Sequence, residues 1–450
     1  MPGPRQRPDT HHVSNKMNRY ATILLALSLL GCPLKAAAAD DSVPVPTAIE
    51  GTAIQPEPAE GMSVGTEPAE NVSVGTEPAE GLALQTELAA EETPQKRGFF
   101  RRVFDYFDGS AIDKTFEKKM DFTFVAGPSY SSKTSLSIGV LAAGLYRVDR
   151  TDSLSSPSNI SIFGNFAISG YYYIGISGNT FFKRNKHRID YELGFRSQPS
   201  AFWGLGYDAI NNTAGSYTAK KYIVDVQYKY ALLKYVYVGG AISFNHTMAK
   251  GLTKPEYLMG QDIRYTATGI GTFIEYDSRD IVTSPFKGIY ASVRAMVYPK
   301  GLGNCGNTLW KVKVTMDWYQ KLWRDAVLAF DLYGEFSSDR TPWTMNAMLG
   351  GNWRMRGYYE GRFNDLDLMS VQVELRQRIY RRIGCTVWGG AGNVFHSFRE
   401  FDWSKTLPNY GIGLRWELKK RMNVRFDYGF GKKVQGKRIS GFIMSINEAF

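Results

Sequence analysis

Hydrophobic and polar residues alternate with a period of two along most of the chain beyond residue 120. Between residues 410 and 418, aromatic or aliphatic residues occupy every even position, whereas the odd positions are Gly411, Gly413, Arg415 and Glu417. Alternation of this kind is typical of a β-strand with two different faces. One face here is apolar and the other carries charges of both signs for about ten residues, as a strand between lipid and a polar lumen requires. The pattern therefore predicts an all-β protein that crosses a membrane with its strands.

About sixteen segments show this alternation. They lie near residues 121–128, 135–148, 159–169, 171–182, 188–197, 217–231, 235–247, 263–277, 287–298, 308–322, 325–337, 367–380, 383–395, 409–419, 422–431 and 438–450. Most even-numbered segments are followed by short connections such as 381–382, and many odd-numbered ones by longer connections such as 338–366. Short turns at one end and long loops at the other are typical of outer-membrane barrels, and only a closed sheet satisfies its backbone in lipid. We therefore predict a transmembrane antiparallel β-barrel of about sixteen strands over residues 119–450.

The first 39 residues are predicted to be an export signal. Met17-Asn18-Arg19 is a short basic start, residues 20–30 are apolar, and four alanines precede Asp40 as a small-residue cleavage site. An alternative stays open, because Leu29-Leu30-Gly31-Cys32 resembles a lipoprotein cleavage box that would lead to a lipid on Cys32. Both interpretations indicate an exported protein.

Two further segments separate this signal from the strands. Residues 40–95 contain twelve acidic residues, no basic residue and four decapeptide repeats at 51–90, and are predicted to be a disordered acidic linker. In residues 96–118, phenylalanines recur at helical spacing beside four basic residues. This amphipathic basic segment is expected either to lie in a membrane interface or to pack as a short plug on the barrel.

Composition excludes several other classes of function. The net charge is +11, which inward-facing charges and an anionic lipid leaflet explain better than a nucleic-acid partner. The three cysteines and five histidines lack the spacing of a metal site. We therefore expect no enzyme activity, no metal and no cofactor.

The stretch 349–365 is too long and too rich in glycine to be a simple hairpin turn, and it is predicted to be a long loop without regular structure. Such loops are uncommon in compact proteins and are usually functional. Within it, Arg356 offers a planar, always-charged group with five donors, which suits a carboxylate at close range.

A barrel of about sixteen strands with Met355-Arg356-Gly357-Tyr358 in its sixth outer loop resembles the bacterial surface antigen family of BamA/TamA-type outer-membrane assembly proteins. The resemblance implies that this loop motif folds back into the lumen and that Glu374 receives Arg356. It also implies two further motifs. These are an inner turn at Asp277, Arg279 and Asp280, and a C-terminal targeting signal at Gly441, Met444, Ile446 and Phe450.

The chain departs from that family in two places. Where the family has an acidic residue on its thirteenth strand, this chain has Trp388-Gly389-Gly390-Ala391-Gly392, so Arg356 is expected to have a single carboxylate partner. No segment resembles the periplasmic POTRA domains, and the acidic linker stands in their place.

By resemblance, the protein is expected to lie in the bacterial outer membrane with its linker in the periplasm. There it would aid the insertion or transport of polypeptides, or of lipids, through a seam between residues 122–127 and 441–450. Its expected partners are outer-membrane lipids, and unfolded outer-membrane protein clients or periplasmic chaperones. The alternative is a passive channel or structural barrel in which Arg356 pins a plug loop.

Overall fold

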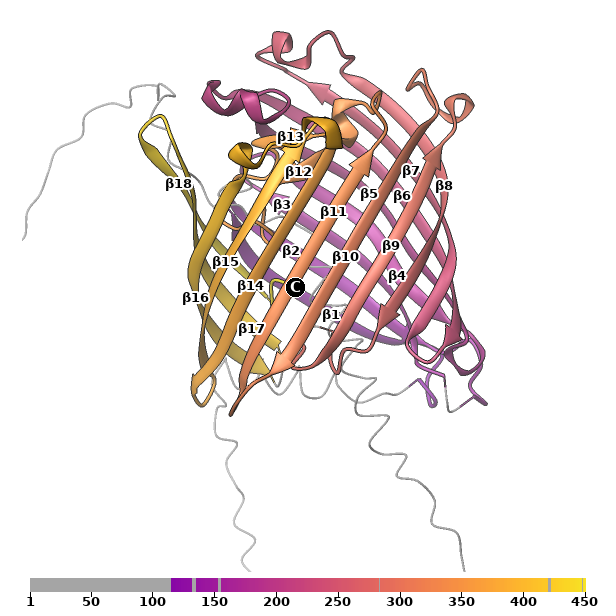
Figure 1. Ribbon diagram of the computed structural model, residues 1–450. Coiled ribbons are helices and arrows are strands. Elements are labelled where there is room, and N and C mark those ends of the chain that lie inside the picture. Colours follow the sequence, from indigo (N-terminus) through magenta and orange to yellow (C-terminus); the bar gives the residue numbers. More distant parts are fainter. Residues whose placement is uncertain (1–114, 132–134, 153–154, 283, 420–421, 447) are drawn as a thin grey trace, which may run out of the picture. The chain divides into compact units, whose positions relative to one another are not determined.

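The structure is a computed structural model that describes residues 115–131, 135–152, 155–282, 284–419, 422–446 and 448–450. Sixteen strands form one antiparallel sheet in which neighbours in the chain are neighbours in the sheet (Figure 1). They are β1 (Asp121–Ser131), β2 (Ser135–Tyr146), β3 (Ser158–Ala167), β4 (Tyr172–Phe181), β5 (His187–Phe202), β6 (Gly215–Leu233), β7 (Val236–Lys250), β8 (Arg264–Asp277), β9 (Gly288–Tyr298), β10 (Leu309–Lys321), β11 (Ala326–Ser337), β14 (Asp367–Tyr380), β15 (Ile383–Phe395), β16 (Leu407–Lys419), β17 (Met422–Val434) and β18 (Lys437–Ile446).

A second, two-stranded sheet and several short 3₁₀ helices lie in the connections. The small sheet pairs β12 (Ala347–Leu349) with β13 (Phe363–Asp365). The 3₁₀ helices are η1 (Lys183–Asn185), η2 (Tyr207–Asn211), η3 (Pro255–Leu258), η4 (Lys300–Leu302), η5 (Trp343–Met345), η6 (Phe398–Glu400) and η7 (Trp403–Lys405). No helix in the described part of the chain is long and apolar enough to cross a membrane.

The predicted all-β barrel fold is confirmed, since each of the sixteen predicted segments overlaps one strand of the large sheet. Two details of the prediction are wrong. The connection 338–366 contains regular structure, namely η5, β12 and β13. The last strand ends at Ile446 and does not reach Phe450.

The faces of the strands follow the alternation in the sequence. In β14, Gln372 and Glu374 are buried, whereas Val371 and Val373 are 37% and 41% exposed. An aliphatic exterior around a charged interior is the arrangement of a barrel in lipid, because the apolar face needs no hydrogen-bond partner there. Inward-facing charges therefore converge on a lumen.

Most of the long connections lie at one end of the sheet, and most of the short ones at the other. One end, here called the loop end, carries the connections 203–214, 251–263, 299–308, 338–366 and 396–406. The other, the turn end, carries 182–186, 234–235, 278–287, 322–325 and 381–382. Because the number of strands is even, β1 begins and β18 ends at the turn end.

The two terminal strands meet without pairing. β1 and β18 approach each other to Cα distances within 8 Å. Among the described residues, however, β1 forms a ladder with β2 alone and β18 with β17 alone. The large sheet therefore has an open seam between its first and last strands.

The predicted signal peptide (1–39), the acidic linker (40–95) and most of the amphipathic segment (96–118) lie outside the described residues, and these predictions stay untested. From the last of these, Thr115 and Phe116 are described. Arg147 donates a 2.8 Å hydrogen bond from Nε to the Thr115 hydroxyl, and its guanidinium carbon lies 3.8 Å from the centre of the Phe116 ring.

Candidate functional site

The long connection between β11 and β14 supplies the central side chain of the site. β12 and β13 pair over three residues each, and the chain between them, residues 350–362, forms a tip. Gly350 and Gly351 have φ angles of +100° and +118°, which favour glycine and turn the backbone sharply after β12. Leu349, Met355 and Phe363 are buried in an apolar cluster that also contains Leu368 of β14. The tip is thus held by its own apolar side chains.

Arg356 is fully buried and binds two carboxylates from two strands. Its Nη2 donates to Oε2 of Glu374 in β14, and its Nη1 donates to Oδ2 of Asp427 in β17 at 2.7 Å. The guanidinium carbon lies 3.7 Å from the centre of the Trp388 ring on β15, which is a cation–π contact. The structure thus brings Arg356 against Glu374, the partner that the resemblance implied.

The expectation of a single carboxylate partner is wrong. Trp388 and Gly390 do leave β15 without an acid facing the loop, but Asp427 supplies the second carboxylate from two strands further along. Its signal was present in the sequence, because Asn423, Arg425 and Asp427 occupy the polar face of the alternating segment 422–431. Which of several inward-facing acids meets a loop depends on where the tip lies, and strand periodicity does not specify that.

Gly357 and Tyr358 complete the motif against β16 and β17. Gly357 has a φ of +105° and lies against the backbone of Gly429. Tyr358 is buried; its hydroxyl donates to the Pro408 carbonyl at 2.7 Å and accepts from the Lys432 backbone N–H at 2.7 Å. Burial raises the pKa of this hydroxyl above its ordinary value, so it stays protonated and able to donate.

A second arginine holds the opposite side of the tip. Arg354 Nε and Nη2 both donate to the carboxylate of Asp331 in β11, at 2.9 and 2.6 Å, and its guanidinium carbon lies 4.3 Å from the centre of the Tyr333 ring. Burial alone would lower the pKa of Arg354, but the carboxylate of Asp331 more than offsets this and raises it. The tip is therefore tied to β11 through Arg354 and to β14 and β17 through Arg356.

The carboxylates that receive Arg356 are shared with arginines of the barrel wall. Glu374 also accepts from Arg376 Nε at 2.6 Å. Asp427 also accepts from Arg415 at 2.5 Å and from Arg425 at 3.1 Å. Since charge-assisted bonds of this kind are the strong ones in proteins, the loop tip is part of one network that spans β14, β16 and β17.

The predicted inner-turn motif lies at the turn end. Arg279 donates to both carboxylate oxygens of Asp277, at 2.9 and 2.8 Å. Oδ1 of Asp280 accepts hydrogen bonds from the backbone N–H groups of Ile281 and Phe286. These contacts fold the turn 278–287 on itself.

The predicted targeting residues divide into two groups. Gly441 and Met444 lie in β18, where Met444 is 38% exposed and Gly441 pairs with Gly429. Phe450 lies beyond the strand; its main-chain carboxyl oxygen accepts from Arg376 Nη2 at 2.9 Å, and the centre of its ring lies 6.4 Å from that of Tyr319. The segment that follows β18 therefore points into the lumen and does not extend the wall.

Among the described residues, no group of His, Cys, Asp and Glu side chains is arranged to hold a metal ion. The arginines and carboxylates of the network pair with one another. What the arrangement can do is hold a loop rigidly inside a barrel and link several strands to it.

Comparison with known proteins agrees with this architecture. The Omp85 superfamily domain matches residues 168–450. BamA from Haemophilus ducreyi lacking POTRA domains 1–3 is similar in structure, with a TM-score of 0.53 and 14% identity over 73% of this chain and 70% of that one. CdiB from Escherichia coli is similar with a TM-score of 0.50 and 13% identity over 73% of this chain and 62% of that one. This chain thus spans less than two thirds of that CdiB structure. At such identities the likeness concerns the fold alone. No curated protein matches the chain in sequence.

Proposed function

The chain belongs to the Omp85 superfamily, and from this premise we propose that it lies in the bacterial outer membrane and aids the insertion or translocation of polypeptides there. The observation that carries the proposal is the open seam. β1 and β18 lie beside each other, yet no ladder joins them in the described part of the chain. Unpaired strand edges are templates for another strand, and a polypeptide segment that pairs with them would enter the membrane with its backbone satisfied.

The loop tip supports this role from inside the barrel. Arg356 and Tyr358 bind β14, β16 and β17, the strands that lead up to the seam. A firmly held wall beside an unpaired edge confines opening to the seam itself. The energy for insertion would come from the strand pairing and lipid burial of the client, so no covalent step is involved.

The test is a folding assay with a seam that can be locked. The purified protein in liposomes is expected to accelerate the folding of a urea-unfolded outer-membrane barrel, measured as its heat-modifiable form on gels. With the native cysteines replaced by serine, cysteine pairs scanned along β1 and β18 should abolish the acceleration when oxidised and restore it when reduced. A matched pair at Val293→Cys and Val314→Cys, which are register partners inside the sheet, should leave the rate unchanged.

Absence of any acceleration would overturn the proposal. A steady single-channel conductance in its place would favour the passive channel, in which the loop tip serves as a plug. Depletion in cells gives an independent readout, since the proposal expects the abundance of other outer-membrane barrels to fall.

A further inference from the structure

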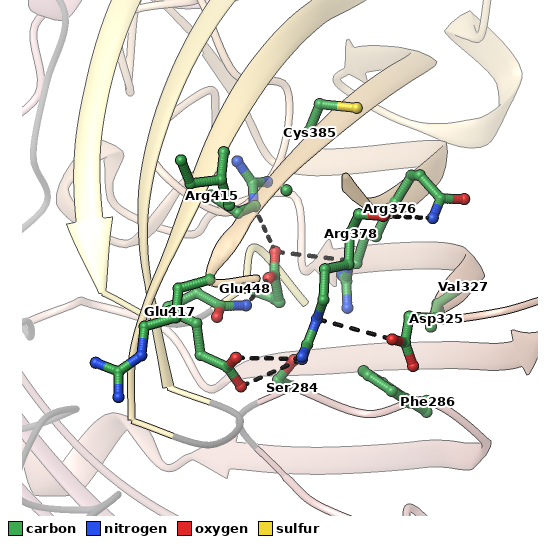
Figure 2. Close-up of a pocket in the computed structure, with 15 residues that line it drawn as sticks. Ser284, Phe286, Asp325, Val327, Arg376, Arg378, Cys385, Arg415, Glu417 and Glu448 are labelled. Carbon is green, nitrogen blue, oxygen red and sulfur yellow. Dashed lines mark hydrogen bonds and ion pairs between the residues drawn. The ribbon is translucent and has the colours of Figure 1, made fainter. Parts of the chain in front are cut away.

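A small pocket opens at the turn end of the lumen, among β14, β15 and β16 and the turn 278–287 (Figure 2). Four guanidinium groups line it, those of Arg376, Arg378, Arg382 and Arg415. Three carboxylates, those of Asp325, Glu417 and Glu448, line it as well. Asp325 and Glu417 belong to the wall and its turns and both pair with Arg378. Glu448 comes from the short segment after β18.

Glu448 occupies this pocket as a ligand occupies a site. Its Oε2 accepts from Arg415 Nε at 2.8 Å and lies 3.7 Å from Arg376 Nε, and its Oε1 accepts from the Asn423 side chain at 2.7 Å. Glu448 is only 4% exposed. Donors from three different strands thus converge on one carboxylate, as Figure 2 shows for Arg376 and Arg415.

Arg376 also contacts the main chain and the ring of Phe450 in the segment after β18. Arg376 Nη2 donates to the main-chain carboxyl oxygen of Phe450 at 2.9 Å, and the Arg376 guanidinium carbon lies 5.3 Å from the centre of the Phe450 ring. Ala449, which lies between Glu448 and Phe450 in the chain, is 2% exposed. The pocket therefore binds a short stretch of polypeptide through an acidic side chain, a main-chain carboxyl group and an aromatic ring.

The site is built independently of its occupant. Arg376 is also held by Glu374, and Arg415 by Asp427. Both guanidinium groups are more than nine-tenths buried, and burying a charge without its counter-charge is costly. With Glu448 withdrawn, two anchored and desolvated cations would face the pocket, which is the preferred receptor for a carboxylate.

We propose that this pocket is a carboxylate-binding site for an extended polypeptide segment, that Glu448 fills it in cis, and that an acidic segment of another chain binds there when the segment after β18 leaves. The occupant seen here is itself a polypeptide, with the Glu448 side chain and the main-chain carboxyl oxygen of Phe450 both at Arg376, and this supports a polypeptide over a lipid phosphate. As a contact for client polypeptides the site rests on the proposed function, whereas binding itself needs only the purified barrel.

The first test measures binding in trans. A fluorescein-labelled peptide, Ser-Ile-Asn-Glu-Ala-Phe, is titrated in detergent with the full chain and with Glu448→Ala, each checked for heat-modifiable migration. The variant is expected to bind at least tenfold more tightly than the parent, and the same peptide with Gln in place of Glu should lose this gain. Equal affinity of both peptides, or equal affinity of both proteins, would overturn the proposal. Displacement of the peptide by phosphatidylglycerol micelles, but not by an unlabelled acidic peptide, would show a lipid site and overturn it too.

The second test measures how firmly the segment is held in cis. Hydrogen exchange of the fragment 441–450 should be at least tenfold faster in Glu448→Gln than in the parent, with partial recovery in Glu448→Asp. Glu417→Gln is the matched control, since Glu417 lines the same pocket but pairs with Arg378; its exchange should match the parent. Parent-like exchange in Glu448→Gln would show that the carboxylate does not hold the segment. Peptide binding and hydrogen exchange are measured on the purified barrel alone, so they test the pocket even if the folding assay shows no acceleration.

Discussion

Gly357 at the tip of the loop and Gly429 in β17 meet backbone to backbone. A Cβ atom on residue 357 would lie 2.6 Å from the carbonyl carbon of Gly429, closer than any real Cβ contact. The close approach brings the Arg356 guanidinium into reach of Asp427 on the same strand. Two glycines thus set the depth at which the loop enters the barrel.

Replacing Gly357 by alanine is therefore expected to push the tip away from β17. The φ of +105° alone would cost an L-residue about 1–3 kcal/mol, and the overlap with Gly429 adds to this. Limited proteolysis of the assembled barrel should show cleavage within residues 350–362 that the parent resists. Gly389→Ala is the control, because a Cβ there meets nothing within 4 Å; protection of the loop in both variants would contradict the prediction.

Removing any one member of the buried set Arg356, Glu374 and Asp427 is expected to destabilise the barrel strongly. All three side chains are fully buried, and breaking such a pair from one side costs about 3–5 kcal/mol. Because Arg356 has two carboxylates and the Trp388 ring, Arg356→Gln should fall at the upper end of that range. The measurement is the temperature at which the compact form is lost on gels.

Exchanging the charges of Arg356 and Glu374 should recover little of this loss. A glutamate at position 356 would face Asp427, and an arginine at position 374 would face Arg376 and Arg415. Like charges in a buried site repel with little screening. Full recovery in the double exchange would mean that the network acts as one isolated pair, contrary to the structure.

The second anchor can be tested with a double-mutant cycle on Arg354 and Asp331. Each single change, Arg354→Gln or Asp331→Asn, removes the paired bonds and should cost about 1.5–3 kcal/mol. The double variant should cost little more than the worse single one, because both changes remove the same bonds. Arg340→Gln, which alters an exposed arginine near the start of the same connection, is expected to behave like the parent. If the free-energy costs of the two single changes add up in the double variant, Arg354 and Asp331 do not interact directly.

Deleting the four decapeptides at 51–90 is expected to leave the stability of the barrel unchanged, because their composition offers little to pack. Loss of stability in the melting assay would mean that this segment folds onto the barrel. Loss of the folding-assay activity with an intact barrel would show a docking role for the acidic residues.

The strands and their faces could be predicted from sequence because period-two alternation is a local property. The alternation places Glu374 on the same polar face as Gln372 and Arg376, whereas its pairing with Arg356 was implied by the family resemblance. The partner Asp427 lay beyond such reasoning, because it depends on where the tip of a long loop ends up. The same holds for the short β12–β13 ladder, which forms only because the tip returns to its starting point.

The end of β18 is a different case, because the residues that end this strand could be recognised from the local alternation alone. Phe442 and Met444 face outward, and continuing the strand would place Glu448 on the same lipid-facing side. A charged side chain there is costly. The chain therefore leaves the wall after Ile446, and the terminal residues turn to the arginines of the lumen.

The wall differs in height around the sheet. β18 has 10 residues and β1 has 11, whereas β6 has 19. At about 3.3 Å per residue and a tilt of about 40°, the terminal strands rise about 25–28 Å along the membrane normal and β6 about 48 Å. The hydrocarbon layer of a typical bilayer is about 30 Å thick, so lipids beside the first and last strands must shorten or tilt to match them. β3 and β4, with 10 residues each, are as short as β18, so the bilayer would be thin along this whole side of the sheet, the unpaired edge included. A strand entering at that edge would cross less hydrocarbon than one entering beside β6.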